Sequence, residues 1–238
     1  MSSEAAGMGS EAPGMGSGAA GMGSEAAGMG SEAPGMGSVA ARLLEAVDFA
    51  ARKHKEQRRM DPEGTPYINH PIAVARILAH EAGVTDVVVL QVTPCPALPG
   101  PARAPAAPRV PSSPQAALLH DTVEDTDATL AEIEERFGAE VRRVVHEVTD
   151  DKSLPKMERK RLQIERAPGC SRRAKLVKLA DKLHNLRDLN RCTPQGWSEE
   201  RVQEYFRWAA RVVSGLRGTS AALEGALQRL FEERGVPT

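Results

Sequence analysis

Apolar residues recur every three or four positions along most of this chain, which is the spacing of one face of an α-helix. Leu43, Leu44 and Val47 begin the pattern, and later segments repeat it. Only 3% of the residues are aromatic, and no stretch of useful length alternates apolar with polar residues as a half-buried strand does. We therefore expect an all-α fold. The predicted helices cover residues 40–57, 71–81, 130–137, 141–148, 155–165, 174–189, 198–216 and 219–234.

Local signals mark several ends of these helices. Gly138 separates two short predicted helices and Gly235 ends the last one, because glycine leaves the helical conformation at little cost. Pro71 can open a helix, since the first helical position needs no amide hydrogen, and Ser198 can cap another. Residues 58–69 are rich in proline, glycine and aspartate, and we expect a loop with a short turn or ribbon there.

A seven-residue repeat fills residues 1–38, with a methionine at every seventh position from Met1 to Met36. Each copy carries glycine and only one large apolar residue, so the repeat lacks the apolar seam of a coiled coil. We predict that this segment is a disordered tail. A tail that binds a partner is the alternative.

Residues 92–115 form a proline-rich insert, in which eight of 24 residues are proline. No helix or central strand can continue through so many prolines. Removing the insert joins residues 86–91 to residues 116–126 in one continuous helical pattern. Codons for its first residue, Val92, start with GT, and its last residue, Gln115, can be encoded by CAG; these are the bases at the two ends of an intron. We hypothesise an in-frame retained intron or a gene-model error, and a proline-rich ligand for SH3 or WW domains is the alternative.

The rest of the 238-residue chain is enough for one domain, which we place at residues 39–238 around the insert. A net charge of -1 provides no broad field for nucleic acid or an anionic membrane. No apolar run approaches the roughly 20 residues of a membrane span, and the N-terminus lacks the pattern of a secretory signal. The three cysteines are odd in number and lack metal-binding spacing. We therefore expect a cytoplasmic protein that binds neither nucleic acid nor membrane.

The stretch from His120 to Asp125 (HDTVED) carries the strongest chemical signal. On a continuous helix, His120 and Glu124 would share one face, and Asp121 and Asp125 another. Adjacent histidine and aspartate suit a divalent ion that accepts one imidazole and one carboxylate. The carboxylates one turn later can handle a water molecule, so the pattern indicates metal-assisted hydrolysis.

Two distant residues complete a candidate metal site. His70 follows the loop of residues 58–69, and Asp181 lies in the predicted helix 174–189. With His120 and Asp121 they would supply two imidazoles and two carboxylates. This donor set suits Mn²⁺, Fe²⁺ or Zn²⁺ better than Ca²⁺.

The sequences around these residues resemble a known family. The pattern of His, His-Asp and Asp is similar to that of the HD phosphohydrolase superfamily. Three segments, TPYINHP at residues 65–71, ALLHDTVEDT at 117–126 and KLADKLHNLRDL at 178–189, resemble the hydrolase domain of RelA/SpoT proteins. The match covers nearly all of residues 40–235 outside the insert. In this extent the chain is similar to the small stand-alone animal form of these hydrolases. The resemblance implies an HD-domain helical bundle that degrades the alarmone guanosine tetraphosphate in the stringent, or starvation, response.

The resemblance also implies roles for individual residues. It places the metal ligands on the four residues of the candidate site, and the pair that activates the attacking water on Glu124 and Asp125. Asn185 matches a residue beside the nucleotide and the metal, and Arg59 matches a basic residue that faces the phosphates and the Glu-Asp pair. The family usually has a second basic residue where this chain has Met60.

Further basic side chains can offset the charge of a phosphorylated substrate. We expect Lys53 and Lys178 to contact it, with Lys175 and Lys182 on the same helix as Lys178. The simpler alternative for this row of lysines is a solvated basic face. For His184 we expect a solvated side chain, with a place beside the nucleotide as the alternative.

These expectations describe a Mn²⁺-dependent enzyme that hydrolyses guanosine 3′,5′-bis(diphosphate), or ppGpp, to GDP and pyrophosphate. One rival is a phosphohydrolase that acts on another nucleotide, such as the 2′-phosphate of NADPH. Other rivals are a non-catalytic nucleotide sensor and an isoform that the insert inactivates. The intact pair of Glu124 and Asp125 favours catalysis, because a binding module needs no general base.

The intron hypothesis predicts a spliced transcript that joins the codons of Gln91 and Ala116 directly. Sequencing the transcript across this junction checks the prediction. Genuine exon junctions flanking the codons of residues 92–115 would contradict it.

Overall fold

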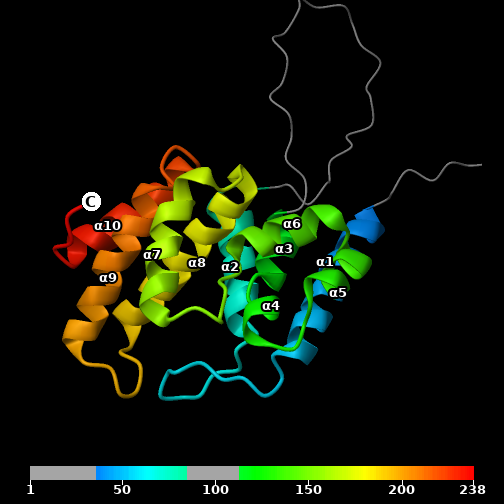
Figure 1. Cartoon of the computed structure of the whole chain (residues 1–238), viewed down its shortest axis with the longest axis horizontal. Helices are drawn as coiled ribbons and strands as arrows, with labels where there is room; N and C mark the ends of the chain where they lie inside the picture. Colours follow the sequence, from blue (N-terminus) through cyan, green and yellow to red (C-terminus); the bar gives the residue numbers. More distant parts are fainter. Residues whose placement is uncertain (1–35, 85–112) are drawn as a thin grey trace, which may run out of the picture. The chain divides into compact units, whose positions relative to one another are not determined.

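The computed structural model describes residues 36–84 and 113–238 (Figure 1). Within these ranges the chain is helical, and its one strand-like pairing is an isolated antiparallel bridge between Arg58 and Pro66. The predicted all-α fold is therefore confirmed. The elements in chain order are α1 (Met36–Lys53), α2 (Asn69–His80), α3 (Ser113–Leu119), α4 (Thr122–Asp125), α5 (Leu130–Phe137), α6 (Ala139–Val148), α7 (Lys156–Arg166), the 3₁₀ helix η1 (Ala167–Gly169), α8 (Arg172–Arg191), α9 (Glu199–Ser214) and α10 (Ala221–Glu233).

Several helix ends lie where the sequence signals place them. Gly138 separates α5 from α6 with a φ of 87°, a conformation that favours glycine. The hydroxyl of Ser198 caps α9 by accepting a hydrogen bond of 3.3 Å from the backbone amide of Arg201. Helix α2 begins at Asn69, two residues before the predicted start at Pro71. Proline fits there because amide hydrogens of the first turn have no partner within the helix.

The boundaries of the tail and the insert need correction. Helix α1 begins at Met36, inside the predicted tail of residues 1–38, and α3 begins at Ser113, inside the predicted insert of residues 92–115. Pro114 is compatible with this start, because proline is tolerated in the first turn of a helix. The remaining residues of both segments lie outside the described ranges.

The HD doublet lies at a break between two helices, so the expectation of one continuous helix across residues 116–125 was wrong. Helix α3 ends at Leu119 and α4 begins at Thr122. The break is stabilised by side chains that take over the last carbonyl groups of α3. The Thr122 hydroxyl donates to the carbonyl of Leu119 at 2.7 Å, and Nδ1 of His120 donates to that of Ala117 at 2.7 Å.

Helix α8 is the centre of the core. Ten of its residues are buried, and it packs against α2, α3, α6, α9 and α10. In Figure 1, α9 and α10 lie on one side of α8, and α1 and α5 lie on the other. A helix buried on several sides places its polar residues inside the protein, where each needs a partner. None of the described helices is both long and apolar enough to cross a membrane.

The predicted ribbon between α1 and α2 is present as a short closed loop. Its two sides meet at the bridge between Arg58 and Pro66, and the amide of Arg59 donates to the carbonyl of Thr65 at 2.8 Å. Asp61 closes the tip by accepting hydrogen bonds from the amide and hydroxyl of Thr65. The loop thereby holds Arg59 in a defined place next to α8.

The close approach of α9 to η1 predicts a cost for adding a single methyl group at Gly215. A Cβ atom there would lie 2.9 Å from Cβ of Ala167 and 3.0 Å from Cδ of Pro168. We expect Gly215→Ala to lower the free energy of unfolding by about 1–3 kcal/mol, because the added atom overpacks the contact. The control is Gly225→Ala within α10, where the nearest atom is 3.9 Å away. That change should stabilise the protein by about 0.5–1 kcal/mol in urea unfolding. Equal stability of the two variants would contradict the prediction.

Candidate metal centre

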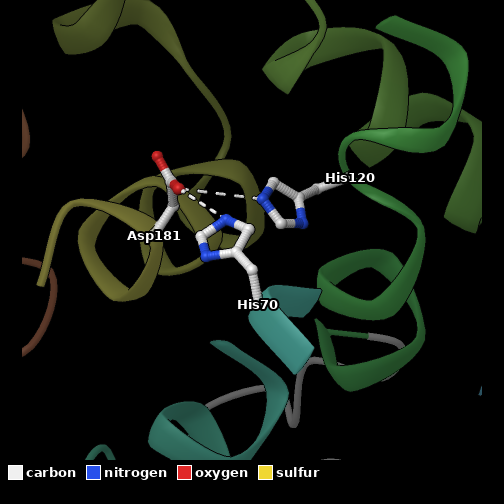
Figure 2. A group of neighbouring side chains, drawn as sticks. All are labelled: His70, His120 and Asp181. Carbon is white, nitrogen blue, oxygen red and sulfur yellow. Dashed lines mark ion pairs between the residues drawn. The ribbon is translucent and has the colours of Figure 1, made fainter. Parts of the chain in front are cut away.

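Three residues that are far apart in the sequence meet at one point of the fold. His70 belongs to α2, His120 follows α3, and Asp181 lies in the middle of α8. One ligand atom from each side chain lies within 4.8 Å of the others. Figure 2 shows Asp181 facing both imidazoles, with its Oδ1 3.2 Å from Nε2 of His70 and 3.8 Å from Nε2 of His120. Atoms at these separations can share one divalent ion after small side-chain movements.

Asp121 brings a second carboxylate to the same point. Its Oδ2 lies 3.4 Å from Nε2 of His70 and 3.1 Å from Nε2 of His120. The hydroxyl of Tyr67 donates a hydrogen bond of 2.7 Å to this oxygen and so orients the carboxylate. The structure thus brings together all four residues that the sequence predicts as ligands.

The donor set fits a metal because one buried imidazole nitrogen at its centre has no hydrogen-bond partner. Nδ1 of His120 donates to the carbonyl of Ala117, so this nitrogen is engaged and Nε2 is the nitrogen left for a ligand. Nε2 of His120 is buried and has no hydrogen-bond partner. A ligand whose outer nitrogen is fixed by a carbonyl group is the usual arrangement of a metal-binding histidine.

The electrostatics of the cluster favour positive charge at its centre. Burial would raise the pKa of Asp121, yet the His120 imidazole holds that pKa well below its usual value. Burial would likewise raise the pKa of Asp181, but Lys182 and the two imidazoles keep it well below the usual value. Burial alone would lower the pKa of His120, whereas the carboxylate of Asp121 raises it to about 10, so without an ion Nε2 holds a proton that a bound metal ion would replace. Both carboxylates are therefore ionised and attract a cation.

Two residues of α8 hold the carboxylate of Asp181 in place. Nζ of Lys182 donates to Oδ2 at 2.7 Å, and Nδ2 of Asn185 donates to Oδ1 at 2.7 Å. Lys182 is buried and remains charged, because Asp181 raises its pKa although burial acts in the opposite direction. Asn185 therefore lies beside the metal residues, as the sequence predicts.

Glu124 lines the same cavity as the four candidate ligands, a space of about 220 Å³. Its Oε2 accepts a hydrogen bond of 3.0 Å from the amide of Asp150, and its Oε1 lies 3.8 Å from Nη1 of Arg159. Burial raises the pKa of Glu124 to about 7, against the opposing effect of the Asp150 amide. A carboxyl group with this pKa can exchange a proton near neutral pH.

Asp125 lines this cavity too, but its carboxylate is paired. One oxygen forms an ion pair with Lys152, and the other lies 3.4 Å from the hydroxyl of Tyr67. Tyr67 therefore connects Asp125 to Asp121. Of the two neighbouring carboxylates, Glu124 has the weaker partners.

The two lysines predicted to contact substrate have different surroundings. Lys178 lines the cavity, is buried, and has a pKa lowered first by burial and then by Lys182. A buried ammonium group with so little compensation attracts an anion. Lys53 lies outside this cavity and forms ion pairs of 3.1 Å with Asp127 and Glu132. The structure therefore places Lys178, and not Lys53, at the site.

Arg59 lies at a second cavity of about 230 Å³ that also includes Met60 and shares Tyr67 and Asn185 with the first. Its Nη2 donates to Oδ1 of Asn185 at 3.2 Å and to Oδ2 of Asp188 at 2.8 Å. The resemblance implied that Arg59 faces the Glu-Asp pair, whereas the hydrogen bonds recorded for its side chain go to α8. Arg59 is thus connected to the metal residues through Asn185.

Sequence reasoning missed three contributors to the site. Tyr67 lies in the segment TPYINHP but was given no role, although its place three residues before His70 brings the two rings together across a turn. Lys152 and Arg159, which pair with the Glu-Asp residues, come from the loop after α6 and from α7. No local sequence signal distinguishes these two cations from the surface lysines and arginines around them.

Two imidazoles, two ionised carboxylates and an adjacent half-buried acid are typical of a hydrolase that uses a divalent ion. Comparison with known proteins agrees with this class. The family defined as "HD domain" matches residues 111–211, which include His120, Asp121 and Asp181.

Relatives with higher similarity define the family more narrowly. Guanosine-3′,5′-bis(diphosphate) 3′-pyrophosphohydrolase MESH1 of Homo sapiens is 67% identical over 197 residues, which are 83% of this chain and 97% of that protein. MESH1 of Drosophila melanogaster is 51% identical over the same shares of both chains. GTP pyrophosphokinase rsh of Brucella melitensis is 36% identical over 155 residues but is covered for only 17% of its length. This chain belongs to the MESH1 family of HD-domain proteins.

Solved structures show the same fold. A metazoan ortholog of SpoT, described as hydrolysing ppGpp and as having a role in starvation responses, matches with a TM-score of 0.71 and 50% identity. The match covers 83% of this chain and 97% of that structure. A protein of Listeria monocytogenes matches with a TM-score of 0.51 and 26% identity, over 72% of this chain.

The charge of the cluster predicts that a divalent ion stabilises the fold. Mn²⁺ at a hundred times its dissociation constant should add about 2.7 kcal/mol to the free energy of unfolding, and a chelator should remove this gain. Asp181→Asn should lose most of the gain, because one ionised ligand becomes a neutral amide. Asp48→Asn on the exposed side of α1 is the control and should keep it. Thermal melting with and without Mn²⁺ makes the comparison, and an equal gain in both variants would contradict the assigned site.

Proposed function

We propose that this chain hydrolyses ppGpp to GDP and pyrophosphate in the cytoplasm, with Mn²⁺ as its metal ion. The observation that carries the proposal is the meeting of His70, His120, Asp121 and Asp181 around the buried Nε2 of His120, in a cavity that Glu124 also lines. Support for the substrate comes from relatives up to 67% identical that are named for this reaction. Support from the chain itself comes from basic residues that line the two cavities, Lys178 in one and Arg59 in the other.

The metal would be held by His70, His120, Asp121 and Asp181. Mn²⁺ accepts both imidazole and carboxylate ligands, which fits this mixed set, and Fe²⁺ or Zn²⁺ fits the same donors. When bound, such an ion supplies Lewis acidity: it lowers the pKa of a water molecule and neutralises charge on a phosphoryl oxygen.

Glu124 is proposed as the group that accepts a proton from the attacking water. Its pKa of about 7 lets it take the proton near neutral pH and release it again. The amide of Asp150 and the guanidinium of Arg159 orient the carboxylate. Asp125 is proposed to assist by fixing Tyr67, and through it Asp121, since its own carboxylate is paired with Lys152.

The substrate would lie across both cavities, because they share Tyr67 and Asn185. Lys178 is proposed to neutralise phosphate charge inside the inner cavity, and Arg59 to do so from the outer one. Met60 adds no charge there, where the family usually has a second basic residue. Lys53 is assigned to the ion pairs that join α1 to the loop after α4 and to α5, rather than to substrate.

A panel of phosphorylated nucleotides with Mn²⁺ tests the proposed substrate. We expect release of pyrophosphate from ppGpp. If NADPH released inorganic phosphate faster than ppGpp released pyrophosphate, NADPH would be the preferred substrate and the alternative would hold. Binding of ppGpp without any product would identify a sensor. A comparison of turnover by the full chain and by a variant lacking residues 92–115 would show whether the insert abolishes activity.

The proposed roles predict that metal binding and turnover separate in two variants. Asp121→Ala should lose both Mn²⁺ binding and turnover, because it removes a ligand. Glu124→Gln should keep Mn²⁺ binding, while kcat falls by about 10²–10⁴-fold through loss of the general base.

The pH dependence of the same variants checks the base. Glu124, with a pKa of about 7, must lose its proton before it can act as a base. Wild-type kcat should therefore rise with pH up to about 7 and then level off. Glu124→Gln should lose this rise. Full activity of Asp121→Ala, or an unchanged pH profile of Glu124→Gln, would contradict the assignment.

A further inference from the structure

The two candidate histidine ligands are supported in different ways at their outer nitrogens. Nδ1 of His120 bonds to a backbone carbonyl, whose position the chain itself fixes. Nδ1 of His70 lies instead 2.9 Å from Nδ1 of His184, the side chain that follows Lys182 and Leu183 on α8. The two rings are 4.8 Å apart at their centroids and inclined by 58°. A side-chain partner can be exchanged by substitution, so its contribution can be measured.

A hydrogen bond between two imidazole nitrogens needs a donor on one ring and a lone pair on the other. Nε2 of His70 faces Asp121 and Asp181, so this nitrogen must present its lone pair if it is to bind a metal ion. The neutral ring then carries its hydrogen on Nδ1 and needs an acceptor there. Nδ1 of His184 is the acceptor that the structure provides.

We propose that His184 is a positioning residue for metal ligand His70. Its Nδ1 accepts the Nδ1 hydrogen of His70, which selects the tautomer with a free Nε2 and fixes the plane of the ring. This inference rests on the metal site of the proposed function and assigns its support to a residue outside the four ligands.

Two neighbours keep His184 available for this role. Oδ2 of Asp188 lies 3.7 Å from Nδ1 of His184, too far for a hydrogen bond, although a carboxylate there would favour a hydrogen on that nitrogen. Arg59 donates to the same Oδ2 at 2.8 Å and thereby occupies it. The Nδ1 lone pair of His184 can then point to His70. Arg59 also supports candidate ligand Asp181 through Asn185.

Mn²⁺ titration of the chelator-treated full chain tests the role of His184. His184→Phe keeps a ring but removes the acceptor, and we expect its Mn²⁺ dissociation constant to rise about 10–100-fold, as for other supporting residues of metal-bound histidines. His184→Asn places an amide oxygen near the position of Nδ1 and should restore most of the affinity. His146→Phe on the exposed side of α6 is the control and should bind like the wild type.

The outcomes separate this inference from the proposed function. Wild-type affinity in His184→Phe would overturn the inference and leave the metal site intact. Equal weakening in the Phe and Asn variants would also overturn it, since only a packing role would then remain. Absence of Mn²⁺ binding by the wild type would overturn the proposed metal site and the inference together.

A second measurement needs no variant and keeps the inference testable if His184→Phe fails to fold. In the Zn²⁺-loaded protein with ¹⁵N-labelled histidines, nuclear magnetic resonance should show a coupling across the hydrogen bond between Nδ1 of His70 and Nδ1 of His184. The hydrogen should reside on His70. A hydrogen on Nδ1 of His184, or the absence of any coupling, would contradict the proposal.

Discussion

The concentration of two ionised carboxylates and two imidazoles at one buried point is the constraint on which the rest of the site depends. Carboxylates so close together repel each other, and taking each out of water is costly, so a cation between them offsets a large penalty. The surrounding contacts hold this unfavourable group of atoms in place. Tyr67 orients Asp121, while Lys182 and Asn185 orient Asp181, and the core helix α8 supplies the last three of these residues. The site is therefore organised before any ion binds.

Sequence reasoning found the helices and the four candidate ligands because these depend on local spacing and on residue type. It missed the break at His120 and Asp121, since the HDTVED stretch has the pattern of a continuous helix and the break depends on hydrogen bonds from His120 and Thr122 back to α3. It also placed Lys53 at the substrate, whereas long-range ion pairs hold that side chain elsewhere. The partnership of His184 with His70 joins residues 114 positions apart, and only the packing of α2 against α8 reveals it.

The proline-rich insert interrupts the chain between the helix that carries His70 and the helix that precedes His120. Helices α2 and α3 nevertheless pack against each other, and both also pack against α8. The ligands on these helices therefore stay together. Contacts with the core hold them in place, instead of the continuous helical connection expected without the insert. The metal site is therefore a property of the packed helices and does not depend on how the chain passes from residue 84 to residue 113.

The position of the bound ion is the most direct test of this account. Crystals of the full chain grown with Mn²⁺ would show the ion by its anomalous scattering. We expect one strong peak within bonding distance of Nε2 of His70, Nε2 of His120 and carboxylate oxygens of Asp121 and Asp181. A peak elsewhere, or ligation through Nδ1 of either histidine, would contradict it.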